Sequence, residues 1–230
     1  MFRRKKAVPE VDPSATGPRT EAVVDDPQPA PAEAASASPA ASQETAELVG
    51  GIDLGGTKIA AAIIGPDHNV ISYSKQPTPD RGGPEDVVRT MVATIRDAAE
   101  AAGVQTSDLR GIGVGAPGSV DTATGSLSGA GNLPNWQASY PLGDQLGKAV
   151  GTRVAVGNDV QVGTNAEYLL GAGAGYDSLL GVFWGTGVGG GIILDGKAWK
   201  GRGRAGEIGH TLVRRGGARA TNGLHGTVEA

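Results

Sequence analysis

Large hydrophobic residues recur along the chain in two different patterns, and few of them lie before residue 47. Short apolar runs bounded by glycines or turn residues predict strands, at 48–54, 58–64, 69–74, 110–115, 153–156, 177–184 and 189–194. Apolar positions three and four apart predict helices, from 84 to before 103, at 142–150 and from 159 to about 170. Asp159 is expected to be the N-cap of the last helix. Residues 119–140 follow neither pattern, so a loop is expected there.

The order of these elements predicts a repeated α/β plan. Three strands, a helix, a strand, a helix, a strand and a helix follow one another, and then a new pair of strands begins. This repetition predicts two related domains, at 47–170 and 171–230, whose glycine turns lie at one cleft. Because about 60 residues are few for an independent core, we expect the second domain to be incomplete and the chain to be a shortened form of a longer protein.

Residues 1–46 contain very few large apolar side chains and are rich in Pro, Ala, Ser and acidic residues. Such a segment cannot bury enough apolar surface to offset the entropy of ordering, so it is predicted to be disordered. The basic run Arg3–Lys6 is interpreted either as an anchor for an anionic surface or as the solvated start of a tail. No apolar segment follows Arg3-Arg4, which argues against an export signal.

Composition narrows the function classes further. No apolar run reaches the ~18 residues that cross a bilayer, and the absence of cysteine excludes disulfides and thiolate metal sites. The net charge of −4 argues against general binding of nucleic acid. A cytoplasmic enzyme or small-molecule binding protein fits best. The 39 glycines cluster at particular turns without a collagen-like period, as expected where backbone approaches a ligand.

Two segments combine glycines with polar side chains suited to phosphate. Asp53-Leu-Gly-Gly-Thr-Lys58 and Gly185-Thr-Gly187 each join two apolar runs, so backbone N–H groups there can approach phosphate oxygens. Asp53 can also bind Mg²⁺, directly or through water. The alternative for the first segment is an ordinary hairpin turn.

Polar residues elsewhere suit a sugar and its phosphorylation. Asp159 follows a strand, where a carboxylate can accept the proton of an attacking hydroxyl, although a plain N-cap needs no function. Glu207 and His210 are three residues apart among glycines, so both can hydrogen-bond sugar hydroxyls. Asn132 can bind a hydroxyl, and Trp136 either covers a sugar face or anchors the loop from the core.

Taken in order, these motifs resemble those of the ROK family of sugar kinases and repressors, with glucokinase-like members most similar. The matching segments are Gly51–Lys58, Gly113–Gly118 with Val120-Asp121, Asn132–Trp136, Asn158-Asp159, Gly185–Gly191 and Gly206–His210. The resemblance covers residues 48 to 230. It implies two ribonuclease-H-like domains of the actin and hexokinase superfamily around a cleft, the second one incomplete, with ATP and sugar bound between them.

The resemblance also implies roles for individual residues. Asp159 would be the general base on the sugar 6-hydroxyl. The sugar would be bound by Asn132, Asn158, Asp159, Glu207, His210 and Glu229. The phosphates would be bound by two turns, Asp53, Gly55, Gly56, Thr57 and Lys58 in one and Gly185, Thr186 and Gly187 in the other.

The chain departs from the family pattern at a cysteine-containing zinc motif. Here the corresponding run, 220–229, has Ala220, Asn222 and Thr227 where the motif has thiolates. His210 alone cannot hold a structural zinc, which takes about four ligands, so no zinc site is expected.

The sequence therefore predicts a hexokinase-type phosphotransferase that uses ATP and Mg²⁺, most simply glucose to glucose 6-phosphate. N-acetylhexosamine, mannose or fructose as acceptor and polyphosphate as donor stay open. A non-catalytic sugar-binding or regulatory role also stays open. Residues 1–46 are rich in proline and have no helical period of apolar residues, which argues against the helix-turn-helix domain of a repressor. A hexose and ATP are the expected partners, with neither nucleic acid nor membrane, and the complete protein is expected to form a homodimer by analogy with the family.

Overall fold

A computed structural model describes residues 47–185, 187–220 and 223–230, all within one compact unit, Ser38–Ala230. The predicted disorder of 1–46 concerns residues outside this range, as does the predicted phosphate contact of Thr186. No helix in the described part of the chain has the length and apolar character needed to cross a membrane.

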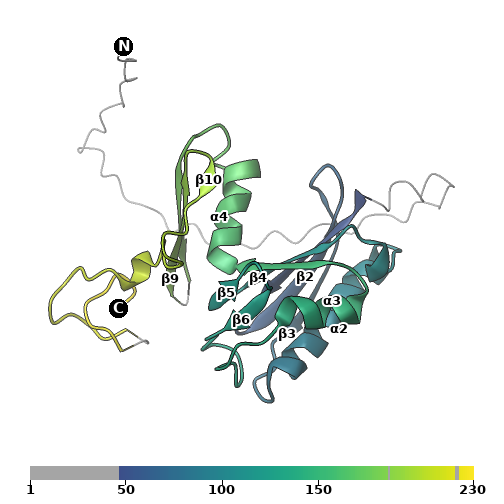
Figure 1. The fold of residues 1–230 in the computed structure, drawn as a ribbon, viewed down its shortest axis with the longest axis horizontal. Helices are drawn as coiled ribbons and strands as arrows, with labels where there is room; N and C mark the ends of the chain where they lie inside the picture. The colour runs from purple at the N-terminus through teal and green to yellow at the C-terminus, as the bar shows by residue number, and fades with distance from the viewer. Residues whose placement is uncertain (1–46, 186, 221–222) are drawn as a thin grey trace, which may run out of the picture. The chain divides into compact units, whose positions relative to one another are not determined.

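A five-stranded mixed sheet forms the first part of the fold (Figure 1). Its strands run in the order β3-β2-β1-β4-β7: β3 (Val70–Pro77), β2 (Lys58–Ile64), β1 (Val49–Leu54), β4 (Ile112–Ala116) and β7 (Val154–Asn158). The first three pair antiparallel, and β1, β4 and β7 pair parallel. The parallel strands therefore end at one edge, where loops of α/β proteins carry ligand sites.

Two helices cover one face of this sheet. The helix α2 (Pro84–Ala101) buries its predicted apolar stripe, and α3 (Leu142–Val150) buries Leu142, Leu146 and Val150 in the same core. Alternate residues of β2, such as Ile59 and Ile63, are fully buried in this core, and β2 packs against α2. Pro84 at the first turn and the Asp86 carboxylate, which accepts the Gly83 N–H at 2.9 Å, start α2. These elements confirm the predicted helices and strands.

The remaining described residues form a three-stranded antiparallel sheet with one helix. The strands β8 (Leu179–Trp184), β9 (Val188–Leu194) and β10 (Lys197–Ala198) lie in the order β10-β9-β8, which repeats the order β3-β2-β1. The helix α4 (Asp159–Leu170) packs on β8 and β9 and also contacts β4 and β7. The domain boundary after Leu170 stays a prediction.

Several sequence-based expectations were wrong in detail. The expected loop 119–140 contains a short hairpin of β5 (Ser119–Asp121) and β6 (Ser126–Ser128), and a 3₁₀ helix η2 (Thr106–Asp108) precedes β4. Strands of three residues are too short for a visible alternation of apolar and polar positions. The N-cap of α4 is Asn158 rather than Asp159, because the Asn158 Oδ1 accepts the Gln161 N–H at 3.2 Å.

Glycines allow α4 to lie close to the second sheet, which gives a first prediction. A Cβ added at Gly191 would lie 2.1 Å from the Oγ1 of Thr164, a fully buried residue of α4. We therefore expect Gly191→Ala to destabilise the fold by about 1–3 kcal/mol through overpacking, measured by urea unfolding. Gly113→Ala is the matched control, because no atom lies within 4 Å of its added Cβ. Equal unfolding midpoints for the two variants would contradict this close packing.

Candidate functional site

Two carboxylates meet at the edge where the parallel strands end. Asp53 of β1 pairs with Gly115 of β4, which pairs in turn with Gly157 of β7. A Cβ at Gly115 would lie 3.5 Å from the Cα of Asp159, so this glycine lets the start of α4 approach the sheet. Both Asp53 and Asp159 line a cavity of about 710 Å³ on the sheet face opposite α2. The structure thus brings together two of the predicted site residues.

Burial and charge both act on these carboxylates. Burial raises the pKa of Asp159, the Val160 N–H opposes the change, and the negative charges of Asp53 and Glu207 raise this pKa further. Burial in the cavity also raises the pKa of Asp53, although its side chain is more exposed to solvent, and Lys58 opposes this rise. A carboxyl group with a raised pKa is the stronger base once it is ionised. The role of Asp159 as a general base stays a prediction.

The raised pKa of Asp159 predicts a dependence of stability on pH. Because burial raises the pKa of this carboxyl in the folded state above its ordinary value in the unfolded chain, its ionisation opposes folding at neutral pH. We expect Asp159→Asn to raise the melting temperature at about pH 7, and the gain to shrink as the pH falls toward about 4. Calorimetry at both pH values measures this. The exposed Asp177→Asn controls for charge alone, and a gain of equal size at both pH values would count against the assignment.

The first glycine turn is braced by residues from two other segments. The Gly55 N–H donates to Lys58 O at 3.0 Å, and the Thr78 hydroxyl donates to Gly55 O at 2.6 Å. A Cβ at Gly56 would lie 2.9 Å from the backbone oxygen of Asn132, so Asn132 lies directly on this turn. The sequence did not reveal the part played by Thr78, since no motif includes it.

The second glycine turn adjoins a cluster of Glu207, His210 and Glu229. The Glu229 Oε2 accepts the Val188 N–H at 3.4 Å, beside Gly187. His210 lies between two carboxylates, with its Nδ1 3.8 Å from Glu207 and its Nε2 3.7 Å from Glu229. The 3₁₀ helix η3 (Ile208–His210) directs Glu207 and His210 to one side. A carboxylate pair around an imidazole offers acceptors and a donor for vicinal hydroxyls.

Asn158 and Trp136 have structural roles here. The Asn158 side chain caps α4, and its Nδ2 donates to Gly118 O at 3.3 Å. A sugar contact of Asn158 stays a prediction. Trp136 is fully buried, with its Nε1 donating to Leu127 O at 3.1 Å, so it anchors the loop and is not available to cover a sugar face.

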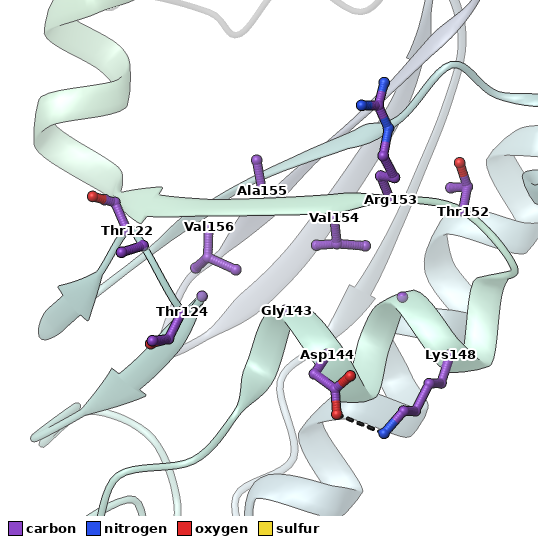
Figure 2. Close-up of a pocket in the computed structure, with 13 residues that line it drawn as sticks. Thr122, Thr124, Gly143, Asp144, Lys148, Thr152, Arg153, Val154, Ala155 and Val156 are labelled. Carbon is purple, nitrogen blue, oxygen red and sulfur yellow. Dashed lines mark hydrogen bonds and ion pairs between the residues drawn. The ribbon is translucent and has the colours of Figure 1, made fainter.

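A second cavity, of about 490 Å³, lies between β7, α3 and the hairpin turn 122–125 (Figure 2). None of the predicted site residues lines it. Figure 2 shows Val154 and Val156 directed toward α3, with an ion pair of 2.7 Å between Asp144 and Lys148 on the helix. This cavity is therefore separate from the predicted site.

Asp53 is the carboxylate that the sequence predicts as a magnesium ligand. Among the described residues, no group of three or more His, Asp or Glu side chains is arranged to hold a metal ion. Asp53 stands at the end of β1 beside the first glycine turn. This donor set fits Mg²⁺, which keeps water ligands and commonly binds through one carboxylate and the phosphates of a nucleotide.

The chain has an α/β fold of the actin and hexokinase type, and glycine turns adjoin acidic residues at its candidate site. The chain belongs to the ROK family, whose model matches residues 49–230. It is 33% identical over 181 residues to a glucokinase of Thermotoga maritima, an alignment that covers 78% of this chain and 55% of that protein. It is 33% identical over 161 residues to an N-acetyl-D-glucosamine kinase of Pectobacterium atrosepticum, covering 70% and 51%. The chain thus spans about half the length of these relatives.

Solved structures give the same fold. A ROK family glucokinase from Streptomyces griseus, in complex with glucose and AMPPNP, matches with a TM-score of 0.68 and 36% identity, covering 79% of this chain and 56% of that one. An inorganic polyphosphate/ATP-glucomannokinase from Arthrobacter matches with a TM-score of 0.62 and 28% identity, covering 72% and 64%.

Proposed function

We propose that this chain carries the acceptor site of an ATP-dependent sugar kinase that phosphorylates the 6-hydroxyl of a hexose, most simply glucose. One observation carries the proposal: the charges of Asp53, beside the first glycine turn, and of Glu207, in the His210 cluster, both act on Asp159. The charges of both predicted binding segments thus reach the proposed base, which supports the proposal. The glucokinase relatives support the same activity.

In the proposed reaction Asp159 accepts the proton of the sugar 6-hydroxyl as its oxygen attacks the γ-phosphorus of ATP. The new O–P bond forms as the bond to the leaving ADP breaks. Glu207, His210 and Glu229 orient the sugar ring, and Asn132 and Asn158 are the further proposed contacts. The N–H groups of the two glycine turns bind the phosphates. Magnesium, which Asp53 would help to hold, neutralises negative charge on the phosphates when bound.

The identity of the acceptor sugar is the most specific part of the proposal. A kinase for an N-acetylhexosamine or for fructose uses the same groups around the 6-hydroxyl, and relatives named for N-acetyl-D-glucosamine make the first of these a real alternative. A non-catalytic sugar-binding or regulatory protein would keep the hydroxyl-binding cluster without turnover. The homodimer of the complete protein stays a prediction as well.

The test is ADP release in the presence of MgATP and a panel of hexoses, using the complete reading frame that contains this chain. Glucose-dependent release with the highest kcat/KM in the panel is the expected result. A higher kcat/KM for N-acetylglucosamine or fructose would replace glucose as the acceptor. Sugar binding by calorimetry without any ADP release would instead support the non-catalytic alternative and reject the kinase.

A further inference from the structure

The first glycine turn presents two backbone N–H groups that nothing in the described part of the chain uses. Gly56 and Thr57 lie exposed between β1 and β2, and no hydrogen bond between described residues includes the N–H of either one. Neighbouring N–H groups in a turn can form a concave site for an anion. A phosphate can use both groups only when they point to the same side of the turn.

The peptide unit between Gly55 and Gly56 does not hold its own orientation. Glycine reaches positive φ without steric cost, so such a unit can rotate between the arrangements that distinguish type I from type II turns. In a trans peptide the C=O and the following N–H lie in one plane and point in opposite directions. Rotation would therefore carry the Gly56 N–H from one side of the turn to the other, and a contact from outside the turn has to select one arrangement.

Thr78 makes such a contact with the turn. Its hydroxyl donates to the Gly55 C=O at 2.6 Å, and its N–H donates to the Thr57 C=O at 3.0 Å. The carbonyls on both sides of Gly56 are thus held toward one residue. Because the Gly55 C=O faces Thr78, the Gly56 N–H of the same peptide unit faces away from Thr78.

Thr78 is itself held in place. It is only 8% exposed and lies between Pro77, the last residue of β3, and Pro79. Each proline ring fixes its own φ and restricts the residue before it to extended backbone, so this segment is stiff. Asn132 restrains the turn from another loop, since a Cβ at Gly56 would lie 2.9 Å from the Asn132 backbone oxygen. The turn therefore has little room to change its shape while Thr78 keeps its bond.

We propose that Thr78 is a positioning residue for the phosphoryl donor: its hydroxyl holds the peptide between Gly55 and Gly56 so that the Gly56 N–H is available to a phosphate oxygen. This inference rests on the proposed kinase function. Thr78 does not contact the phosphate and acts only through the peptide unit that it holds. The inference adds to the predicted site a residue that lies outside all of its motifs.

Loss of the Thr78 hydroxyl has a specific consequence for the nucleotide. The peptide between Gly55 and Gly56 is then free to rotate, and in part of the molecules the Gly56 N–H no longer faces the phosphate. The apparent affinity for the nucleotide falls in proportion to the fraction of molecules that keep the competent arrangement. The sugar is bound by other groups, so its affinity does not change.

A purely structural role for the Thr78 hydroxyl would give a different result. Its loss would leave the Gly55 carbonyl without this donor and lower stability, with no selective effect on the nucleotide. Thr106 provides a matched control, because it is 7% exposed and its hydroxyl donates to the Val150 C=O at 2.7 Å. It lies in η2, outside both glycine turns. Thr106→Val therefore removes the same kind of bond at a position that contacts no predicted site residue.

The first test measures nucleotide binding and needs no turnover. MgAMPPNP is titrated by calorimetry into the complete reading frame that contains this chain. Thr78→Val, which nearly keeps the size of the side chain and removes the hydroxyl, is expected to weaken binding about tenfold, the effect of one hydrogen bond. Thr78→Ala also lacks the hydroxyl and is expected to weaken binding to the same extent. Thr78→Ser, which keeps the hydroxyl, and Thr106→Val are expected to bind like the parent.

Four results would overturn the proposal: equal binding by Thr78→Val and the parent, equal losses in Thr78→Val and Thr106→Val, a loss in Thr78→Ser as large as that in Thr78→Val, or no binding of MgAMPPNP by the parent. Thermal melting checks that each variant is folded at the temperature of the titration. Similar melting temperatures of the two valine variants are expected, because each loses one hydroxyl that bonds to a backbone carbonyl.

A second test separates this proposal from the kinase function. In steady-state ADP release by the complete reading frame, Thr78→Val is expected to raise KM for ATP about tenfold and to leave KM for the sugar unchanged. Turnover by both the parent and Thr78→Val with the same KM for ATP keeps the kinase and rejects the positioning role. Nucleotide binding that depends on the Thr78 hydroxyl, without turnover on any hexose of the panel, keeps the positioning role and rejects the kinase.

Discussion

Asp159→Asn is expected to lower kcat for sugar phosphorylation by about 10²–10⁴-fold, while the affinity for the sugar changes little. The amide keeps the size of the side chain and can still bind a hydroxyl, but it cannot accept a proton. Burial and the charges of Asp53 and Glu207 raise the pKa of this carboxyl, which makes it the stronger base once it is ionised. The measurement combines steady-state ADP release with sugar binding by calorimetry, both in the complete reading frame.

Two controls make this result specific. Asp177→Asn removes a carboxylate from an exposed position outside the predicted site and is expected to leave kcat unchanged. Because Asp159→Asn is also expected to raise the melting temperature, unfolding cannot explain its loss of activity. Ordinary turnover by Asp159→Asn would show that the base has been assigned to the wrong residue.

Trp136→Ala is expected to cost about 3–5 kcal/mol of unfolding free energy, the largest effect on stability that we predict. The Trp136 side chain is fully buried, and its ring packs edge-on against Tyr140 with the centroids 5.4 Å apart. Truncation would leave a cavity in the core under α2 and α3, beside the loop that holds Asn132 against Gly56. Urea unfolding of parent and variant measures the loss.

The matched control replaces an exposed tryptophan instead of the buried one. Trp199 is 50% exposed, so Trp199→Ala is expected to change stability by less than about 0.5 kcal/mol. Trp136→Phe should be milder than Trp136→Ala, because the phenyl ring fills most of the space that alanine would leave empty. In both variants the Leu127 carbonyl keeps its bond from the Tyr140 N–H at 2.9 Å. Similar unfolding midpoints for Trp136→Ala and Trp199→Ala would contradict the role of Trp136 as the loop anchor.

The sequence alone determined the long elements and the order in which they follow. The helix at 84–101 and the strand at 58–64 were predicted because their periods of apolar residues are local and extend over many positions. The order of the motifs also predicted membership of the ROK family, which the family match confirms. Glycine turns, an acid after a strand and a Glu-x-x-His spacing can all be recognised without any long-range contact.

Only the tertiary structure decided which of these residues meet. Glu229 lies 41 positions from the Val188 N–H that it accepts, and Asn132 reaches Gly56 from a distant loop. No local pattern encodes such contacts, because they depend on how α4 packs between the parallel strands and the β8–β9 hairpin. The same packing buries Asp159 near two other carboxylates and so raises its pKa. Trp136 shows the same limit, since a loop tryptophan can face a ligand or the core, and the burial of its ring against Tyr140 decided for the core.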